Sequence, residues 1–341
     1  MNVLKNFQDA VTLKRGAGSR TEMAYVSHLV KLLPQSMIDE AGNIWVDLRT
    51  EAHHRTCFTA HTDTVHHAEG TNEYEVDGKF WRAKGAALGA DDGAGIALLL
   101  HLIENNVPAL YVFFRGEEIG GIGSTYASEN LADMFDGIDR AIAFDRAGYY
   151  DVITHQAGGQ CCSDKFASAL SEALSTEDMS IMYMPCDKGV FTDTANLVSI
   201  VSECTNLSVG YASQHGDKES QDVEFLQTLA AKIVTIDWDS LPTERKLTQQ
   251  YRYKGIAADY APRKLQQDNS PMLEALEAAI YDNDLGPLRT TISEYMGPEY
   301  AYYIERLSFD RKDMLTAYDM LLDGEDDSAI IDGILFDSYI A

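Results

Sequence analysis

The sequence lacks any apolar run long enough to cross a membrane, and its first residues lack the basic, apolar and small-residue order of a secretion signal. Basic side chains are also scarce, because 27 Lys and Arg stand against 54 Asp and Glu and leave a net charge of −27 at pH 7. A chain of this charge repels nucleic-acid backbones and anionic membranes. We therefore expect neither nucleic acid nor a membrane among its partners.

Cysteine is scarce as well. The five cysteines are odd in number and are spaced neither as a disulfide framework nor as a Cys-rich zinc site: Cys57, Cys161, Cys162, Cys186 and Cys204. Free thiols are typical of a reducing compartment, so we expect a cytoplasmic protein. The hydrophobic content of 45% over 341 residues is that of an ordinary globular chain with room for a full core and a small second unit.

The two parts of the chain differ in their pattern. Over residues 1–240, strand-like and helix-like segments alternate, which predicts an α/β domain with a mixed, mostly parallel sheet flanked by helices. After Leu241 the segments have patterns typical of helices, are separated by Pro and Gly, and contain no cluster of metal-ligand residues. We predict a catalytic domain over residues 1–240 and a small all-helical C-terminal extension over residues 241–341, with no role assigned to the extension.

One predicted strand ends in two adjacent carboxylates. Residues 109–114 are typical of a buried strand, and a glycine, Glu117 and Glu118 follow soon after it. Ligands bind at such loops in open α/β sheets, and neighbouring side chains point in different directions, so one glutamate can bind a metal while the other acts as a base. A chain with 54 acidic residues also produces adjacent pairs by chance. Beyond the pair, Ser124 is the predicted N-cap of a helix that ends near Asp133.

Other predicted strands also lead to residues that can bind metals. The strand 56–60 leads to His61, and Asp63 could hold that imidazole in one tautomer through its second nitrogen. The strand 140–144 leads to Asp145, and a last strand near residues 207–211 leads to His215. For each of these residues a turn or surface role is the plain alternative, because aspartate is a common turn former and the chain has nine histidines.

Two loops add further carboxylates. A run of small residues over 84–95 contains Asp91 and Asp92 at the start of an apolar helix, where one aspartate could bridge two cations and the other could cap the helix. Asp193 lies in a short loop over residues 190–197.

Together these residues match the needs of a two-metal hydrolase. Two histidines and three carboxylates suit a pair of borderline cations such as Zn²⁺. One carboxylate must bridge the two cations, and a further free carboxylate must take a proton from bound water and pass it to a leaving amine. Six residues are available for these six roles: His61, Asp91, Glu117, Glu118, Asp145 and His215.

The motifs resemble those of the di-zinc exopeptidases, a class of compact aminopeptidases, peptidase T-like tripeptidases and acyl-amino-acid deacylases. The resemblance covers about residues 17–235 and keeps the order of the motifs, which are His61-Thr62-Asp63-Thr64, Gly89-Ala90-Asp91-Asp92-Gly93-Ala94-Gly95, Gly116-Glu117-Glu118, Phe144-Asp145, and His215 with Glu219. It implies two divalent metal ions per chain, most often Zn²⁺, with Mn²⁺ or Co²⁺ as alternatives. In that scheme Asp91 bridges the metals, His61 and Asp145 complete one site, and Glu118 and His215 complete the other.

The resemblance also implies roles for residues around the metals. Glu117 matches the general base, and Asp63 matches the residue that orients His61. Asp92 takes the position joined to the bridging residue, typically through a cis peptide. The loop with Asp193 resembles the substrate-side loop, so Asp193 is a candidate for binding a substrate amino group, with a structural hydrogen bond as the alternative.

One departure from the class is informative. Peptidase T-like members and deacylases carry an inserted domain between the ligands that match Asp145 and His215. That interval is too short here for such a domain, so we predict no inserted dimerisation domain and an architecture close to the compact aminopeptidases. The Gly-Ala-Asp-Asp motif itself resembles that of peptidase T.

We therefore expect a metallo-exopeptidase, a hydrolase of aminopeptidase type, that cleaves an amide bond near the amino terminus of a peptide. One alternative is an amidohydrolase that removes an acyl group from an acylated amino acid. Another is a metal-binding scaffold that acts through the C-terminal helices, although a pure scaffold has no need of Glu117. The sequence leaves the side-chain specificity and the oligomeric state open, with a homo-oligomer as one option.

Overall fold

The computed structural model describes residues 3–176 and 178–247, together with Gly286, Leu288, Thr290 and Thr291. The chain divides into two units, Met1–Tyr253 and Lys254–Ala341. The helices predicted for the C-terminal extension lie outside the described residues, apart from a few positions near 290, and the predicted boundary after residue 240 stays a prediction. Residues just beyond that boundary belong to the first unit, and Arg140 Nη2 donates to the Leu241 carbonyl at 2.9 Å.

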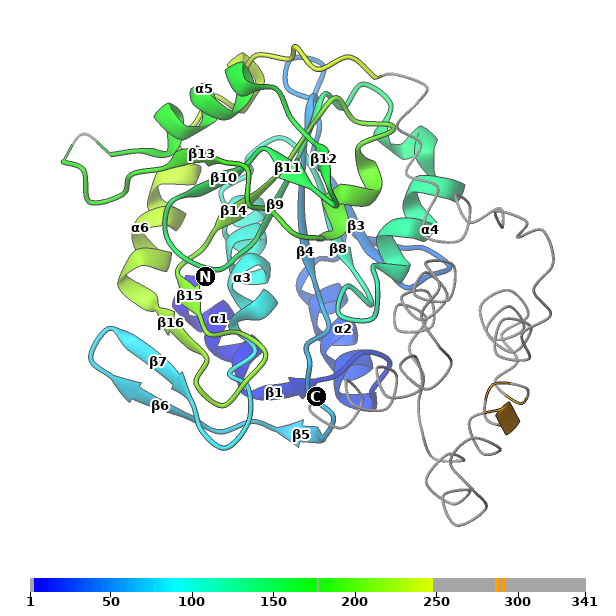
Figure 1. The fold of residues 1–341 in the computed structure, drawn as a ribbon, viewed down its shortest axis with the longest axis vertical. Coiled ribbons are helices and arrows are strands. Elements are labelled where there is room, and N and C mark those ends of the chain that lie inside the picture. The colour runs from blue at the N-terminus through cyan, green and yellow to red at the C-terminus, as the bar shows by residue number, and fades with distance from the viewer. Residues whose placement is uncertain (1–2, 177, 248–285, 287, 289, 292–341) are drawn as a thin grey trace. The chain divides into compact units, whose positions relative to one another are not determined.

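An eight-stranded sheet forms the centre of the first unit (Figure 1). The neighbours β14, β9, β4 and β8 are parallel, whereas β10, β3 and β2 pair in antiparallel fashion with strands beside them. This is the mixed, mostly parallel sheet that the sequence predicts. In sheet order the strands are β13 (Met184–Cys186), β10 (Asp151–Ile153), β14 (Glu203–Ser208), β9 (Arg140–Arg146), β4 (Thr56–His61), β8 (Leu110–Phe114), β3 (Ile44–Asp47) and β2 (Met37–Ile38).

The central strands are apolar on both faces, and each face has its own core. On β8, Tyr111 and Phe113 join the core with α1, α3 and α6, whereas Leu110, Val112 and Phe114 join a second core with α4, η1 and η2. Figure 1 shows α3 and α4 on opposite sides of β4 and β8. The helices are α1 (Val3–Val11), α2 (Arg20–Leu32), α3 (Ala90–Glu104), α4 (Ile122–Asn130), α5 (Asp164–Leu174) and α6 (Val223–Ile233), with 3-10 helices η1 (Ala132–Phe135), η2 (Asp193–Leu197) and η3 (Trp238–Ser240).

Smaller sheets hold the loops around the centre. Antiparallel β15 and β16 flank the loop that contains His215, and β16 continues onto β7. Gly210, with φ of +91°, separates β14 from β15, so the one strand predicted near residues 207–211 is two strands. The four-stranded sheet is β15 (Tyr211–Ala212), β16 (Ser220–Asp222), β7 (Phe80–Ala83) and β6 (Tyr74–Asp77), and the two-stranded ladders are β1 (Leu13–Arg15) with β5 (Glu69–Thr71) and β11 (His155–Gln156) with β12 (Gly159–Gln160).

The interval between Asp145 and His215 contributes directly to this architecture. Its strands β10, β13 and β14 belong to the central sheet, β11 and β12 form a hairpin, and β15 begins the four-stranded sheet. In the described part of this interval there is thus no separate inserted domain, as predicted.

The helix after the two adjacent glutamates begins earlier than predicted. Its N-cap is Gly121, with φ of +67°, so the prediction that Ser124 caps the helix is wrong. Ser124 is instead buried inside α4, where its hydroxyl donates to the Gly121 carbonyl at 3.1 Å and accepts from Asn196 Nδ2 at 2.8 Å. The Ser124 hydroxyl, which the N-cap preference of serine predicted to cap the helix, instead bonds to Asn196, a residue far away in the sequence. The helix ends at Asn130, and Asp133 lies in η1.

Two further expectations from the sequence concern disulfide bonds and membrane-spanning helices. All five cysteines are free, as expected. No helix of the described residues has the length and apolar character needed to span a membrane.

Candidate metal centre and active site

The candidate site lies where the carboxyl ends of the central parallel strands meet. Strand β4 lies between β9 and β8. The chain passes from β4 to β8 on one side and later crosses to β9 on the other, and such a switch point is where open α/β sheets bind ligands. His61 ends β4, Glu117 and Glu118 follow β8, and Asp145 is near the end of β9. Asp91 lies in the first turn of α3, which packs against β4 and β9.

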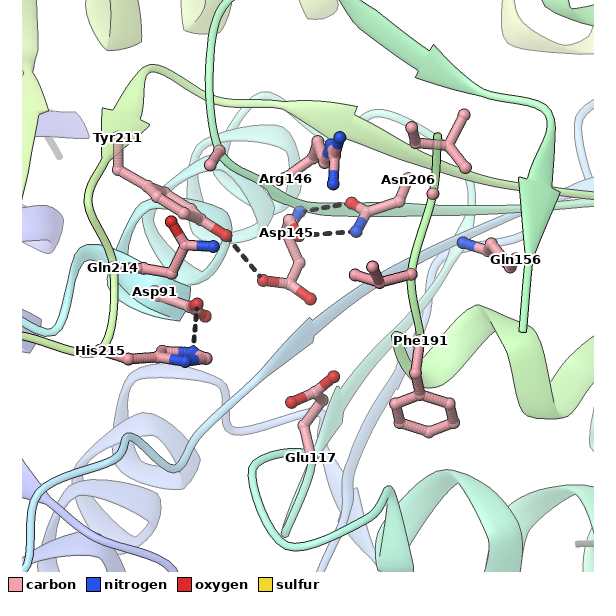
Figure 2. A pocket seen from close by; sticks show the side chains of 14 residues that line it. Asp91, Glu117, Asp145, Arg146, Gln156, Phe191, Asn206, Tyr211, Gln214 and His215 are labelled. Atoms are coloured by element: carbon pink, nitrogen blue, oxygen red, sulfur yellow. Dashed lines mark hydrogen bonds and ion pairs between the residues drawn. The ribbon is translucent and has the colours of Figure 1, made fainter. Parts of the chain in front are cut away.

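The carboxylate of Asp91 lies between two imidazoles. Its Oδ1 is 3.0 Å from His61 Nε2. Its Oδ2 is 3.1 Å from His215 Nε2 (Figure 2). On one side His61 Nε2 is 3.6 Å from Asp145 Oδ1, and on the other His215 Nε2 is 3.3 Å from Glu118 Oε2. The structure therefore brings all five predicted metal ligands together. Asp145 lies beside His61 and Glu118 lies beside His215, which are the pairs that the resemblance implies.

Asp63 is buried and fastens two segments of the site. Its Oδ1 is 3.4 Å from His61 Nδ1 and accepts hydrogen bonds from the backbone N–H groups of Gly116 at 2.9 Å and Glu117 at 3.1 Å. Its Oδ2 accepts from the backbone N–H of Glu118 at 3.1 Å. The contact with His61 is the one that the resemblance implies. The three bonds to the glutamate loop are a further finding.

The peptide between Asp91 and Asp92 is cis, as the resemblance implies. Asp92 accepts hydrogen bonds from the backbone N–H of His61 at 3.1 Å and of Gly95 at 2.9 Å, so it ties β4 to the start of α3. The chain is packed closely here, because a Cβ at Gly95 would lie 2.4 Å from Asp92 Oδ1 and 2.6 Å from the Phe144 carbonyl oxygen. Of the two aspartates, Asp92 makes the cap-type bond, to the backbone N–H three residues on, although the N-cap of α3 is Gly89.

Buried charged residues support the site, and sequence reasoning gave them no such role. Glu219, quoted only as part of a motif, accepts hydrogen bonds from the backbone N–H groups of Gly89 and Asp91, both at 3.0 Å. The fully buried Arg15 donates to the carbonyls of Thr62 and Gly89 and so joins the loops after β4 and before α3. A sequence shows a charged residue without showing its burial, which is why these residues were missed.

The pKa values in the cluster are shifted because several acidic side chains are buried close to one another and to only two histidines. Burial and the charge of Asp91 raise the pKa of Glu118 to about 8. Burial also raises the pKa of Glu117 well above its usual value. Burial opposes the ionisation of Asp91, but hydrogen bonds from the two histidines hold its pKa below the usual range. The hydrogen bond to Asp91 raises the pKa of His215 to about 9.

These residues fit a pair of divalent cations. Ligand atoms fall into two groups within 4.8 Å, one of His61, Asp91 and Glu118 and the other of His61, Asp92 and Asp145. Among the described residues, the buried Glu118 Oε1 has no hydrogen-bond partner, so it has a lone pair to offer. Imidazole and carboxylate are the donors that Zn²⁺ prefers when it leaves open positions for water, and bound cations would offset the crowded negative charge.

A pocket of about 80 Å³ opens beside these residues (Figure 2). Glu117 and Asp145 line it, and the Glu117 carboxylate makes no hydrogen bond to the described residues. Asp145 is held more firmly, because it accepts hydrogen bonds from the Thr192 hydroxyl at 2.7 Å and the Tyr211 hydroxyl at 3.1 Å. The arrangement offers one carboxylate without hydrogen bonds to the described residues, beside a hydrogen-bonded cluster of candidate ligands.

Asp193 lies at the start of η2 and does not line this pocket. Its side chain is buried, and its Oδ1 has no hydrogen-bond partner among the described residues. Burial raises its pKa to about 7. A role for Asp193 in binding a substrate amino group stays a prediction.

No family model matches this sequence, and no curated protein matches it. Solved structures do match. Aminopeptidase PepT from Bacillus cereus has a TM-score of 0.57 at 14% identity, over 68% of this chain and 96% of that chain. A tripeptidase from Staphylococcus aureus has a TM-score of 0.55 at 15% identity, over 68% and 96%. The TET1 peptidase from Pyrococcus horikoshii has a TM-score of 0.54 at 13% identity, over 68% and 98%.

The chain has the di-zinc exopeptidase fold. At these identities the likeness establishes the fold. The activity has to be argued from the residues of this chain.

Proposed function

We propose that the chain is a co-catalytic di-metal exopeptidase that hydrolyses an amide bond near the amino terminus of a peptide. The observation that carries this proposal is the Asp91 carboxylate held between His61 and His215, beside the free carboxylate of Glu117. Aminopeptidases and tripeptidases are among the solved structures with this fold, which supports a hydrolase.

In this proposal five residues would hold two divalent metal ions, most often Zn²⁺, with Mn²⁺ or Co²⁺ as alternatives. His61, Asp91 and Asp145 would hold one ion, and Asp91, Glu118 and His215 would hold the other. When bound, such ions polarise a carbonyl and lower the pKa of water. Asp63 holds the His61 imidazole in position through Nδ1, which leaves Nε2 free to bind.

Glu117 serves as the general base. Its carboxylate takes one proton from the attacking water as the new carbon–oxygen bond forms, and it returns that proton to the amide nitrogen as the carbon–nitrogen bond breaks. A raised pKa makes this carboxylate a stronger proton acceptor. Hydrogen bonds from the backbone of this loop to Asp63 hold Glu117 in place while its side chain remains free.

Asp193 is proposed to receive the amino group of the substrate. Its support is a buried carboxylate with an unpartnered oxygen, on a loop whose preceding residues Val190 and Phe191 line the pocket. We further propose a cytoplasmic location, from the free cysteines, and a homo-oligomer, because the TET1 peptidase with this fold can assemble into a tetrahedron or a large octahedral shell.

A substrate panel tests the proposal. Purified full-length chain is stripped of metal, reloaded with Zn²⁺, Mn²⁺ or Co²⁺, and assayed on short peptides with a free amino terminus and on N-acyl amino acids. Metal-dependent release of the first amino acid supports an aminopeptidase. Cleavage of N-acyl amino acids alone would make the protein a deacylase. Hydrolysis of neither class would refute the enzymatic proposal and favour a scaffold.

A further inference from the structure

Arg146 directly follows Asp145 on β9, and its side chain lines the same pocket as Glu117 (Figure 2). The guanidinium is half-buried and fixed, because Nε donates to Asp151 Oδ2 at 3.2 Å and Nη2 donates to the Lys188 carbonyl at 3.1 Å. Nη1 has no acceptor among the described residues. The side chain is therefore held in place with donors to spare.

Two other polar side chains that line the pocket beside Asp145 are already occupied. The amide of Asn206 bonds to both the backbone N–H and the carbonyl of Asp145, at 2.8 and 2.6 Å. The Tyr211 hydroxyl donates to the Asp145 carboxylate. Arg146 is thus a positively charged group beside Asp145 that retains hydrogen-bond donors for a ligand.

The charge of the pocket makes this cation unusual. Asp91, Glu117 and Asp145 line the pocket, and the whole chain carries a net charge of −27. Bound metal ions would offset the charge of Asp91 and Asp145, whereas Glu117 and the net charge of the chain would still repel a negatively charged group on a substrate unless a cation faced it. Among the lining residues Arg146 is the one Arg or Lys.

We propose that Arg146 binds the free carboxylate on the leaving side of the substrate. The protein would then act on short substrates in which the departing amino acid ends in a carboxylate close to the scissile amide, and it would discriminate against blocked or long chains. A guanidinium presents planar, paired donors that match a carboxylate. The inference rests on the proposed amide hydrolysis, but it applies equally to a dipeptide and to an N-acyl amino acid, because both release an amino acid with a free carboxylate.

The test compares free-acid and amidated forms of one substrate. Metal-loaded full-length protein is assayed on alanyl-alanine, on N-acetylalanine and on the C-terminal amide of each. A charge-assisted hydrogen bond of this kind predicts a preference of about 10- to 100-fold in kcat/KM for the free acid. The Arg146→Gln variant should lose that preference, mainly through KM, so that its kcat/KM on the free acids falls to that on the amides. Arg146→Lys should keep part of the preference.

A matched variant removes one positive charge elsewhere. Arg20 is highly exposed and pairs with Glu69 on the surface, so Arg20→Gln should keep the full preference for the free acid. A second measurement needs no variant of the pocket. In the wild-type protein, alanine should compete with the substrate more strongly than alaninamide does, and equal inhibition by the two would overturn the proposal.

The outcomes separate this inference from the proposed function. Equal rates on acids and amides in the wild-type protein would refute the role of Arg146 and leave amide hydrolysis standing. If Arg146→Gln lowers kcat/KM equally on the free acids and on the amides, the side chain serves to hold the loop at Lys188. That result would also refute the inference. If the metal-loaded wild-type protein hydrolyses none of these substrates or other peptides, the proposed function fails, and this inference fails with it.

Discussion

At the scale of single residues, Asp63 shows how one buried carboxylate sets the position of two segments. It faces the Nδ1 atom of His61 and accepts three backbone hydrogen bonds from Gly116, Glu117 and Glu118. Because both carboxylate oxygens are used, a change here should move a metal ligand and the proposed base together.

Replacing Asp63 with Asn tests that role. An amide has one acceptor oxygen, and its N–H donors would face either the backbone N–H groups of the glutamate loop or the imidazole. We expect metal affinity to fall by about 10- to 100-fold. Calorimetric titration of Zn²⁺ into metal-stripped protein measures this. Asp77→Asn, at an exposed position, is the control and should bind as the wild type does. Unchanged affinity in Asp63→Asn would show that the contact is not needed.

Replacing Glu117 with Gln tests the proposed base. The change removes the proton acceptor but keeps the size of the side chain, so metal content and thermal stability should stay at wild-type values while kcat falls by about 10²- to 10⁴-fold. Glu118→Gln is the matched change at the adjacent position, and it should lower metal content instead. Near-wild-type turnover in Glu117→Gln would remove this residue from the chemistry.

The residues found from sequence and those missed differ in a physical way. His61, Asp91 and Glu118 stand in short motifs at strand ends, so their type and position suggest metal binding. Arg15 and Glu219 act through backbone atoms of loops far away in the sequence. Their burial depends on how the loops fold over them, and no pattern near them in the sequence reports it.

At the scale of elements, the start of α3 is the most closely packed part of the site. Asp92 bonds to His61 and Gly95, and Gly95 lies against the Phe144 carbonyl of β9. The absence of a side chain at Gly95 is what lets α3 approach the two central strands that carry metal ligands.

Gly95→Ala should therefore destabilise the fold. A Cβ at 2.4 to 2.6 Å from three oxygen atoms forces the helix away from the sheet, and overpacking of this kind costs about 1–3 kcal/mol. For a folded unit of this size we expect Tm to fall by about 2–10 °C in differential scanning calorimetry. Gly216→Ala is the control, because a Cβ there meets no atom within 4 Å. Equal melting of the two variants would contradict this account of the packing.

The strands that are buried on both faces of the sheet were predictable from the sequence. Strands β4 and β8 carry apolar side chains on both faces, and that pattern identified them. The start of α4 was not predictable by the same means. Ser124 satisfies the local rule for an N-cap, but its hydroxyl is taken by Asn196, about 70 positions away, and Gly121 supplies the turn instead.

At the scale of the whole molecule, alternation of strands and helices was enough to predict the mixed sheet and its two helical layers. The strand order was not predictable from that pattern, because it depends on which strands pair across long intervals. Strand β9 pairs with both β4 and β14, and those pairings bring Asp145 beside His61. The acidic cluster thus lies at the carboxyl ends of the central strands.

The measurement that tests the central claim most directly is elemental analysis of the purified full-length chain, with peptide hydrolysis assayed before and after chelation. The account predicts about two divalent metal ions per chain. It also predicts that hydrolysis is lost on chelation and restored by Zn²⁺, Mn²⁺ or Co²⁺. A folded protein that binds no metal at neutral pH, or one that keeps its full hydrolytic rate after chelation, would contradict it.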